Sequence, residues 1–194
     1  MKNIIELLSI DERKNIKEVT LQKEQILFNE GDVCECVGIV ISGVIEITSY
    51  SYNGREIIFN HLESGMLFGN NLILSSEPIY KGSIIAKTPT KIALIYKNAL
   101  ISLLQNNKSF LLEYLKHQSD MSKELNGKIK LLTLDSAEER FFLYLTTHKG
   151  KIKYQTISGL AKELYLQRET LSRLLTKLVK ENKISINNKA MERI

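Results

Sequence analysis

The segment of residues 156–182, TISGLAKELYLQRETLSRLLTKLVKEN, contains two blocks of helical periodicity separated by a tight turn at residues 165–167. Apolar residues at intervals of three and four place one face of each helix against a core. The inner face of the first block consists of Leu160, Ala161 and Leu164. The inner face of the second block consists of Leu171, Leu174, Leu175 and Leu178. The pattern predicts a helix-turn-helix, with Thr156 or Ser158 as the cap of its first helix.

The outward-facing positions of the second block carry residue types that read DNA. They are Gln167, Arg168, Glu169, Ser172, Arg173 and Lys177. The guanidinium group of arginine offers a forked pair of donors that matches O6 and N7 of guanine, and glutamate accepts from N4 of cytosine. In a helix-turn-helix the second helix lies in the major groove. We therefore expect these side chains to contact DNA, and a helical hairpin with a solvated polar face is the alternative.

The basic charge of the chain is concentrated around this segment. Residues 148–194 hold 11 Lys and Arg against 4 Asp and Glu, a net charge of +7, whereas the other 147 residues hold 16 against 18, a net charge of −2. A basic domain beside a nearly neutral one favours a polyanionic partner. The lysines at positions 149, 151, 153 and 162 are expected to meet phosphates. A short strand and polar turn at residues 184–189 predict the wing of a winged helix.

The composition is that of an ordinary globular protein, with 43% hydrophobic and 25% charged residues among 194. No apolar run approaches the roughly 20 residues of a membrane helix, and the first residues show no secretion signal. We therefore expect a cytoplasmic protein with no membrane partner. Cys34 and Cys36 are too few for a disulfide framework. They are expected to be small buried residues, and metal binding or oxidation is the alternative.

Residues 20–96 have the character of an antiparallel β-domain. Turn signals separate short runs rich in Ile, Val, Tyr and Phe at residues 24–28, 37–41, 44–50, 55–62, 81–86 and 91–96. Asn53 and Gly54 tolerate the positive φ angles of a tight turn and predict a hairpin between two of these runs. Many short strands at this spacing predict an antiparallel barrel or sandwich. Residues 1 to about 18 are expected to form a short amphipathic helix.

From residue 98 to residue 134 the apolar period is helical and no proline interrupts it. One stripe alternates intervals of four and three, as a coiled-coil seam does. It consists of Leu111, Leu115, Gln118, Ser122, Leu125, Ile129 and Leu132. We expect this stripe to be a dimer seam, because symmetric homodimers are the commonest oligomers, and packing on the chain's own β-domain is the alternative. The pair Asn126-Gly127 is a signal that bends or ends a helix.

A new helix is expected to begin after residue 135. Asp135 or Ser136 can cap it, and Glu138 and Glu139 suit the positive end of the helix dipole. The chain therefore divides into an effector-type β-barrel domain at residues 1–107, a dimerisation helix and hinge at 108–134, and a winged-helix domain at 135–194.

Five stretches in this order are similar to motifs of the Crp/Fnr superfamily of bacterial transcription regulators. They are ILFNEGD at 26–32 with GIVISGVIEI at 38–47, NGRE at 53–56, GMLFG at 65–69, SAEER at 136–140 and RETLSR at 168–173. The resemblance covers essentially the full length. It implies an α+β fold with an N-terminal antiparallel β-barrel of the double-stranded jelly-roll type, a long dimerisation helix and a C-terminal winged helix-turn-helix.

The resemblance also implies a sequence-specific DNA-binding regulator that reads an inverted repeat as a homodimer, with Arg168, Glu169 and Arg173 on the bases. The expected partners are double-stranded DNA and a second copy of the chain, with RNA polymerase and an unidentified small-molecule effector as further candidates. We expect no enzyme activity, because the chain shows no motif of a catalytic site.

The resemblance finally marks where an effector would bind. The positions that hold the ribose, the phosphate and the adenine in cyclic-AMP-binding members correspond to Gly69, Asn70 and Asn71, to Tyr80 and Lys81, and to Leu125 and Asn126. The ribose carboxylate, the phosphate arginine and one adenine contact are absent from this set. We therefore predict that cyclic AMP is not the effector, and we expect no cofactor or metal. Another small molecule in the same pocket and a barrel without any ligand are the alternatives.

Two positions near the predicted recognition helix depart from the family. Tyr165 stands in the turn where glycine is usual, and a left-handed conformation there costs about 1 kcal/mol. Gln167 replaces the serine or threonine that normally caps the second helix. Both departures favour the alternative function, a small-molecule-binding or protein-interaction module whose tail domain no longer reads DNA.

Overall fold

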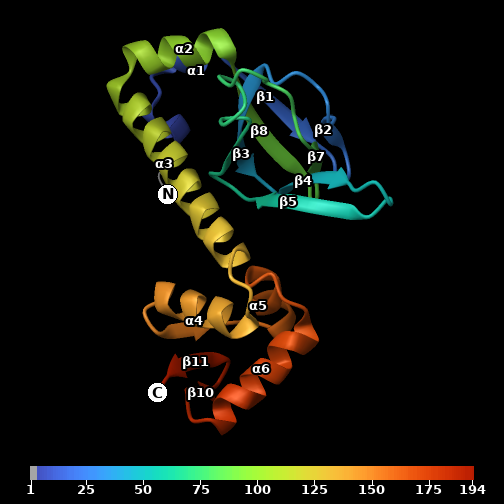
Figure 1. The fold of residues 1–194 in the computed structure, drawn as a ribbon. Coiled ribbons are helices and arrows are strands. Elements are labelled where there is room, and N and C mark those ends of the chain that lie inside the picture. The colour runs from blue at the N-terminus through green and yellow to red at the C-terminus, as the bar shows by residue number, and fades with distance from the viewer. Residues whose placement is uncertain (1–3) are drawn as a thin grey trace. The chain divides into compact units, whose positions relative to one another are not determined.

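The computed structural model of the protein describes residues 4–194 (Figure 1). The chain divides into two compact units, one that ends at Ser119 and one that runs from Asp120 to Ile194. Helix α3 (Lys108–Leu132) continues from the first unit into the second. No helix within residues 4–194 combines the length and the apolar character needed to cross a membrane.

The first unit is built on two four-stranded antiparallel sheets. One sheet has the strand order β1-β8-β3-β6 and the other β2-β7-β4-β5. The strands are β1 (Ile16–Leu21), β2 (Ile26–Phe28), β3 (Cys36–Ser42), β4 (Ile45–Tyr50), β5 (Glu56–Leu62), β6 (Leu67–Phe68), β7 (Ser83–Ala86) and β8 (Thr90–Tyr96). Apolar side chains of both sheets form a single core. This arrangement confirms the predicted α+β fold, with a barrel made of two separate sheets and not of one closed ladder.

The hairpin expected at Asn53-Gly54 joins β4 to β5. Gly54 has a φ of 76°, and its amide donates to the carbonyl of Ser51 at 2.8 Å. The two strands pair in antiparallel register from Ile45 opposite Leu62 to Tyr50 opposite Glu56. A glycine is needed here because other residues adopt a positive φ only at a cost.

The prediction of one amphipathic helix before residue 18 is wrong for the residues that the structure describes. A 3₁₀ turn η1 (Ile4–Leu7) and a short helix α1 (Ile10–Arg13) precede strand β1, which pairs with β8 along its whole length. Residues 1–3 of that prediction lie outside the described part of the chain. The interval of three between Ile16 and Val19 suggests a helix, but cross-strand pairing overrides so weak a local signal.

The helical region expected at residues 98–134 consists of two helices. Helix α2 (Lys97–Asn106) ends at Asn107, which has an extended backbone, and α3 then runs without interruption for 25 residues. The expected bend or end at Asn126-Gly127 is not observed, because both residues lie inside α3. An isolated glycine weakens a helix by about 1 kcal/mol, which a long helix tolerates.

The second unit contains the predicted helix-turn-helix and wing. After α3 come α4 (Ala137–Thr147), β9 (Lys151–Lys153), α5 (Ile157–Glu163), α6 (Arg168–Lys180), β10 (Ile184–Asn187) and β11 (Ala190–Arg193). The wing sheet has the order β10-β11-β9. Ser136 caps α4 in a reciprocal capping box with Glu139, and Thr156 caps α5. The predicted inner faces of α5 and α6 are all buried.

Candidate DNA-binding surface and effector pocket

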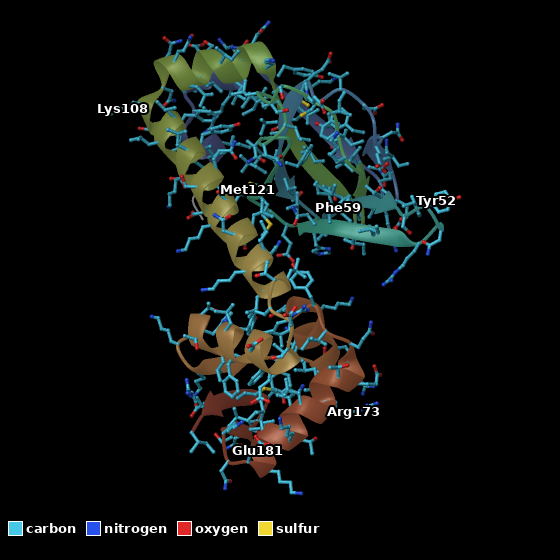
Figure 2. All side chains as sticks on the ribbon, viewed as in Figure 1. Tyr52, Phe59, Lys108, Met121, Arg173 and Glu181 are labelled. Atoms are coloured by element: carbon cyan, nitrogen blue, oxygen red, sulfur yellow. The ribbon has the colours of Figure 1, made fainter. Side chains whose placement is uncertain are left out.

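Helix α6 presents a polar face that its own domain leaves uncovered. The six residues predicted to contact DNA, Gln167, Arg168, Glu169, Ser172, Arg173 and Lys177, are all exposed. Figure 2 shows Arg173 on the side of α6 that faces away from α4. The buried leucines at positions 171, 174, 175 and 178 fix this orientation, because they bind the opposite face of α6 to the domain core. The structure therefore leaves this face of α6 accessible to solvent.

Two further residues share this outer face and were missed by the sequence reasoning. Thr176 and Lys180 lie three and seven positions after Arg173, so they continue the same stripe along α6. Both are exposed. The spacing of i+3 and i+7 from Arg173 is the signal that could have identified them. A lysine at this end of the stripe can neutralise a phosphate, whereas the threonine hydroxyl already donates to the carbonyl of Ser172 at 3.0 Å.

Lys177 is engaged differently from the other predicted contacts. Its Nζ atom lies 2.9 Å from a carboxylate oxygen of Glu138 on α4, and 3.9 Å from Glu181. Lys183 forms the same kind of ion pair with Glu138 at 3.0 Å. Hydrogen bonds from Lys177 and Lys183 lower the pKa of Glu138. Lys177 therefore links α6 to α4, and a phosphate would have to compete with this carboxylate for it.

The turn before α6 has the strained geometry expected from its sequence. Tyr165 has a φ of 54°, in the left-handed region that glycine normally occupies. Gln167 takes the N-cap position, and within the described residues its side chain makes no capping hydrogen bond. Two backbone hydrogen bonds close the turn. The amide of Leu166 donates to the carbonyl of Ala161 at 2.9 Å, and the amide of Tyr165 donates to the carbonyl of Lys162 at 3.1 Å.

Most of the predicted dimer seam lies on the solvent-exposed surface of α3. The exposed members are Leu115, Ser122, Leu125, Ile129 and Leu132, whereas Leu111 and Gln118 are partly covered. The four apolar members of the exposed group keep between 49% and 58% of their surface accessible. Phe110 and Tyr114, which pack on the barrel, occupy a different face of the same helix. An exposed apolar stripe of this length favours a partner helix.

Gln118 faces the barrel and not the seam. Its side-chain oxygen accepts a hydrogen bond from the side-chain amide of Asn70 at 2.7 Å, and its side-chain amide donates to the backbone carbonyl of Asn70 at 2.7 Å. The hydroxyl of Tyr114 donates to the same carbonyl at 3.1 Å. Asn70 follows β6, in the loop predicted to meet the ribose of a nucleotide, and is only 2% exposed. The sequence did not reveal this link between the loop and α3.

Tyr80, predicted for the phosphate end of the effector pocket, is part of the barrel core. It is 3% exposed, stacks on Phe28 with ring centroids 5.0 Å apart, and donates from its hydroxyl to the carbonyl of Cys36 at 3.4 Å. Gly69 lies against it, because a Cβ atom at Gly69 would be 3.4 Å from the Tyr80 hydroxyl and 2.7 Å from the Cys36 carbonyl. Tyr80 thus occupies interior space of the barrel.

The other four residues predicted for the effector pocket are exposed. Asn71 and Lys81 are exposed, and the Lys81 Nζ atom lies 4.0 Å from a carboxylate oxygen of Glu77 at the surface. Leu125 and Asn126 belong to the second unit of the chain and are exposed there. The structure therefore brings together Gly69, Asn70 and Tyr80.

The two cysteines are buried, as predicted, with 2% of Cys34 and 1% of Cys36 exposed. Burial raises the pKa of the Cys34 thiol and raises that of Cys36 to about 11. A thiol with a raised pKa in an apolar setting reacts slowly, because the thiolate is the reactive form. Among the residues that the structure describes, no group of three or more His, Cys, Asp or Glu side chains is placed to hold a metal ion.

Comparisons with known proteins agree with this architecture. Residues 18–107 match the cyclic nucleotide-binding domain family. The anaerobic regulatory protein of Bacillus subtilis is 25% identical over 178 residues, which cover 86% of this chain and 75% of that protein.

Two solved structures show the same fold over nearly the whole chain. The catabolite activator protein of Thermus thermophilus is 20% identical, covers 100% of this chain and 94% of its own, and has a TM-score of 0.58. The structure of CprK complexed with OCPA is 13% identical, covers 94% of this chain and 87% of its own, and has a TM-score of 0.70.

The chain is therefore similar to the cyclic nucleotide-binding domain family over residues 18–107, and it shares the fold of Crp/Fnr-type transcription regulators. The resemblance inferred from the five sequence motifs is confirmed.

Proposed function

We propose that this protein is a sequence-specific DNA-binding transcription regulator of the Crp/Fnr type. The observation that carries the proposal is the polar face of α6, where Arg168, Glu169 and Arg173 are exposed while four leucines bind the opposite face to the core. A helix held in this way can enter a major groove without rearrangement of its domain. The net charge of +7 in residues 148–194 adds attraction to the phosphate backbone.

The active form in this proposal is a homodimer held along α3. The exposed stripe of Leu115, Leu125, Ile129 and Leu132 supports it, because leucine and isoleucine at alternating intervals pack well against an identical helix. Two-fold symmetry in the protein then requires two-fold symmetry in the DNA site. The expected site is an inverted repeat with half-sites about one helical turn apart. RNA polymerase is the further partner expected at the promoter.

Cyclic AMP is not the effector in this proposal. Asn70 stands where cyclic-AMP-binding members place a ribose-binding glutamate, and it is bonded to Gln118 instead. Tyr80 and Lys81 stand in place of the phosphate-binding Arg-Ser pair, and Tyr80 is packed in the core. A nucleotide that bound the folded protein would raise its midpoint of thermal unfolding by mass action. We expect no such rise with cyclic AMP.

The test of the proposal is selection of bound duplexes from a random library by the purified full-length protein without added ligand. We expect recovery of an inverted repeat whose affinity falls steeply with salt, since each neutralised phosphate releases counterions. Recovery of no preferred sequence, both without ligand and with a small-molecule extract of the source cells, would contradict DNA recognition.

The strain at Tyr165 and the uncapped start of α6 favour a second function, an interaction module whose tail domain has lost DNA recognition. The same selection separates the two functions. A module of this kind enriches no sequence and shows only the weak salt-dependent binding of any basic domain.

A further inference from the structure

Arg140 makes a set of hydrogen bonds that the proposed DNA contacts do not use. Its Nε atom donates to the carbonyl of Leu134 at 2.9 Å, Nη1 donates to the carbonyl of Tyr165 at 3.1 Å, and Nη2 donates to the carbonyl of Leu132 at 3.5 Å. Leu132 is the last residue of α3, and Tyr165 lies in the turn before α6. One guanidinium group therefore joins the end of the dimerisation helix to the turn of the helix-turn-helix, within the second unit.

Two of the three carbonyls, those of Leu132 and Tyr165, have physical reasons to need this partner. The last four carbonyls of a helix lack intrahelical donors, and a cation at a helix C-terminus is favoured by the helix dipole. The Tyr165 peptide is held at a φ of 54°, a conformation that an L side chain adopts only under tertiary constraint. The planar fork of arginine fixes direction as well as charge, whereas a lysine would supply a single point charge.

The backbone segment that carries Arg140 is held in place by its own contacts. Arg140 lies in the first turns of α4, where the Ser136–Glu139 capping box fixes the start of the helix. The next residue, Phe141, is fully buried in the core of the second unit. The Arg140 backbone therefore has little freedom, and movement at the end of α3 must either break these hydrogen bonds or carry the turn with it.

We propose that Arg140 is a positioning residue that sets the direction of α6 relative to the end of α3. It would thereby set the separation of the two recognition helices in the dimer. This inference rests on the proposed function, since the separation matters only if both helices read DNA. It predicts that the hinge at residues 133–135 and the turn at residues 165–167 open together, and that loss of the guanidinium relaxes the required half-site spacing.

The first test is hydrogen exchange of the full-length, DNA-free protein, which does not depend on DNA recognition. The reporters are the amides of Thr133 and Leu134 in the hinge and of Tyr165 and Leu166 in the turn, all bonded to backbone carbonyls. In Arg140→Ala we expect all four to exchange about tenfold faster, because local opening no longer breaks the shared hydrogen bonds. The wing amide of Tyr154, bonded to the carbonyl of Lys189, should keep its rate.

Arg140→Lys separates charge from geometry, and Arg193→Gln is the matched control. Lysine keeps the positive charge near α3 but cannot reach three carbonyls at once. We therefore expect Arg140→Lys to raise the exchange rates of the same amides as Arg140→Ala does. Arg193 lies over the Phe142 ring at 5.7 Å, and its loss removes a charge from the same unit without touching hinge or turn. Rates that change in only one of the two segments, or throughout the unit, would overturn the proposal.

The second test measures affinity for duplexes that carry the selected inverted repeat with its spacer lengthened or shortened by one base pair. The parent should bind these at least about tenfold more weakly than its preferred spacing, because a changed spacer moves one half-site out of register with its recognition helix. Arg140→Ala should lose this discrimination but keep its base preference within each half-site. A variant that discriminates spacing as the parent does would overturn the inference. If the parent recovers no preferred sequence, the proposed function fails, and the exchange experiment still decides whether Arg140 couples the hinge to the turn.

Discussion

The barrel and the winged helix use their candidate site residues in opposite ways. In the barrel, Asn70 and Tyr80 are residues predicted to line an effector pocket, but both are buried and hydrogen-bonded within their own chain. In the winged helix, Arg168 and Arg173 are the side chains predicted to contact DNA, and both are exposed. A polar group that its own fold has already satisfied has little left to offer a ligand, whereas a solvated one can exchange water for a partner.

A truncation in the buried barrel core should produce the largest loss of stability. Tyr80→Ala removes a ring that stacks on Phe28 in the barrel core, and a truncation of this size costs about 3–5 kcal/mol of unfolding free energy. Urea denaturation of the full-length protein would measure it. Tyr80→Phe is the control, because it keeps the ring and loses only the hydroxyl, whose hydrogen bond to the Cys36 carbonyl is worth about 1 kcal/mol. Equal stability of the alanine variant and the parent would mean that Tyr80 does not fill the barrel.

Removing a hydrogen-bond donor from the exposed face of α6 should weaken DNA binding and leave folding intact. Arg173→Ala should weaken binding to the selected inverted repeat by roughly 1–3 kcal/mol and relax specificity at one base position. Fluorescence anisotropy with matched and substituted duplexes would measure both. The unfolding free energy should stay close to that of the parent, because the side chain is solvent-exposed. If this variant reads every duplex as the parent does, Arg173 is not a base contact.

Breaking the hydrogen bonds between Gln118 of α3 and Asn70 of the barrel should have a smaller effect on the unfolding free energy than Tyr80→Ala has. Gln118→Ala removes both hydrogen bonds to Asn70 and leaves buried polar groups without these partners, at a cost of about 1–3 kcal/mol. Ser122→Ala, one turn further along the same helix and exposed, should cost much less. Urea unfolding followed by hydrogen exchange in residues 69–72 would place the loss in the loop. Similar losses from both variants would indicate a general effect on α3.

The smallest expected effect is a gain in unfolding free energy. Tyr165→Gly relieves a left-handed backbone and should stabilise the second unit by about 1 kcal/mol. Tyr165→Ala is the control, because it removes the ring but keeps a side chain at a positive φ. Chemical denaturation would separate the two. A gain with alanine equal to that with glycine would show that the ring, and not the backbone, carries the strain.

Local patterns predicted the winged helix well and the N-terminal unit less well. The four leucines of α6 repeat at helical spacing, so their burial follows from the helix period alone. Strand β1 was missed because its six residues carry no strong local signal. Its conformation comes from pairing with β8, where Ile16 lies opposite Ile95 some eighty residues later in the chain. The three-residue strand β9, which the sequence reasoning also missed, depends on β11 in the same way.

The class of fold, the order of its parts, the face that α6 buries and the residues that it leaves outside could all be predicted from local sequence patterns. These follow from residues close together in the chain, through period, capping and turn chemistry. Other contacts became visible only in the folded chain: Asn70 is hydrogen-bonded to Gln118, Tyr80 fills the barrel, Lys177 pairs with Glu138, and Arg140 contacts both the hinge and the turn. The hydrogen bonds that join Asn70 to Gln118, Tyr80 to Cys36 and Arg140 to Tyr165, and the ion pair of Lys177 with Glu138, link residues 25 to 48 positions apart. Such pairs meet only after the chain has folded, because no local period specifies which distant group a polar side chain will face.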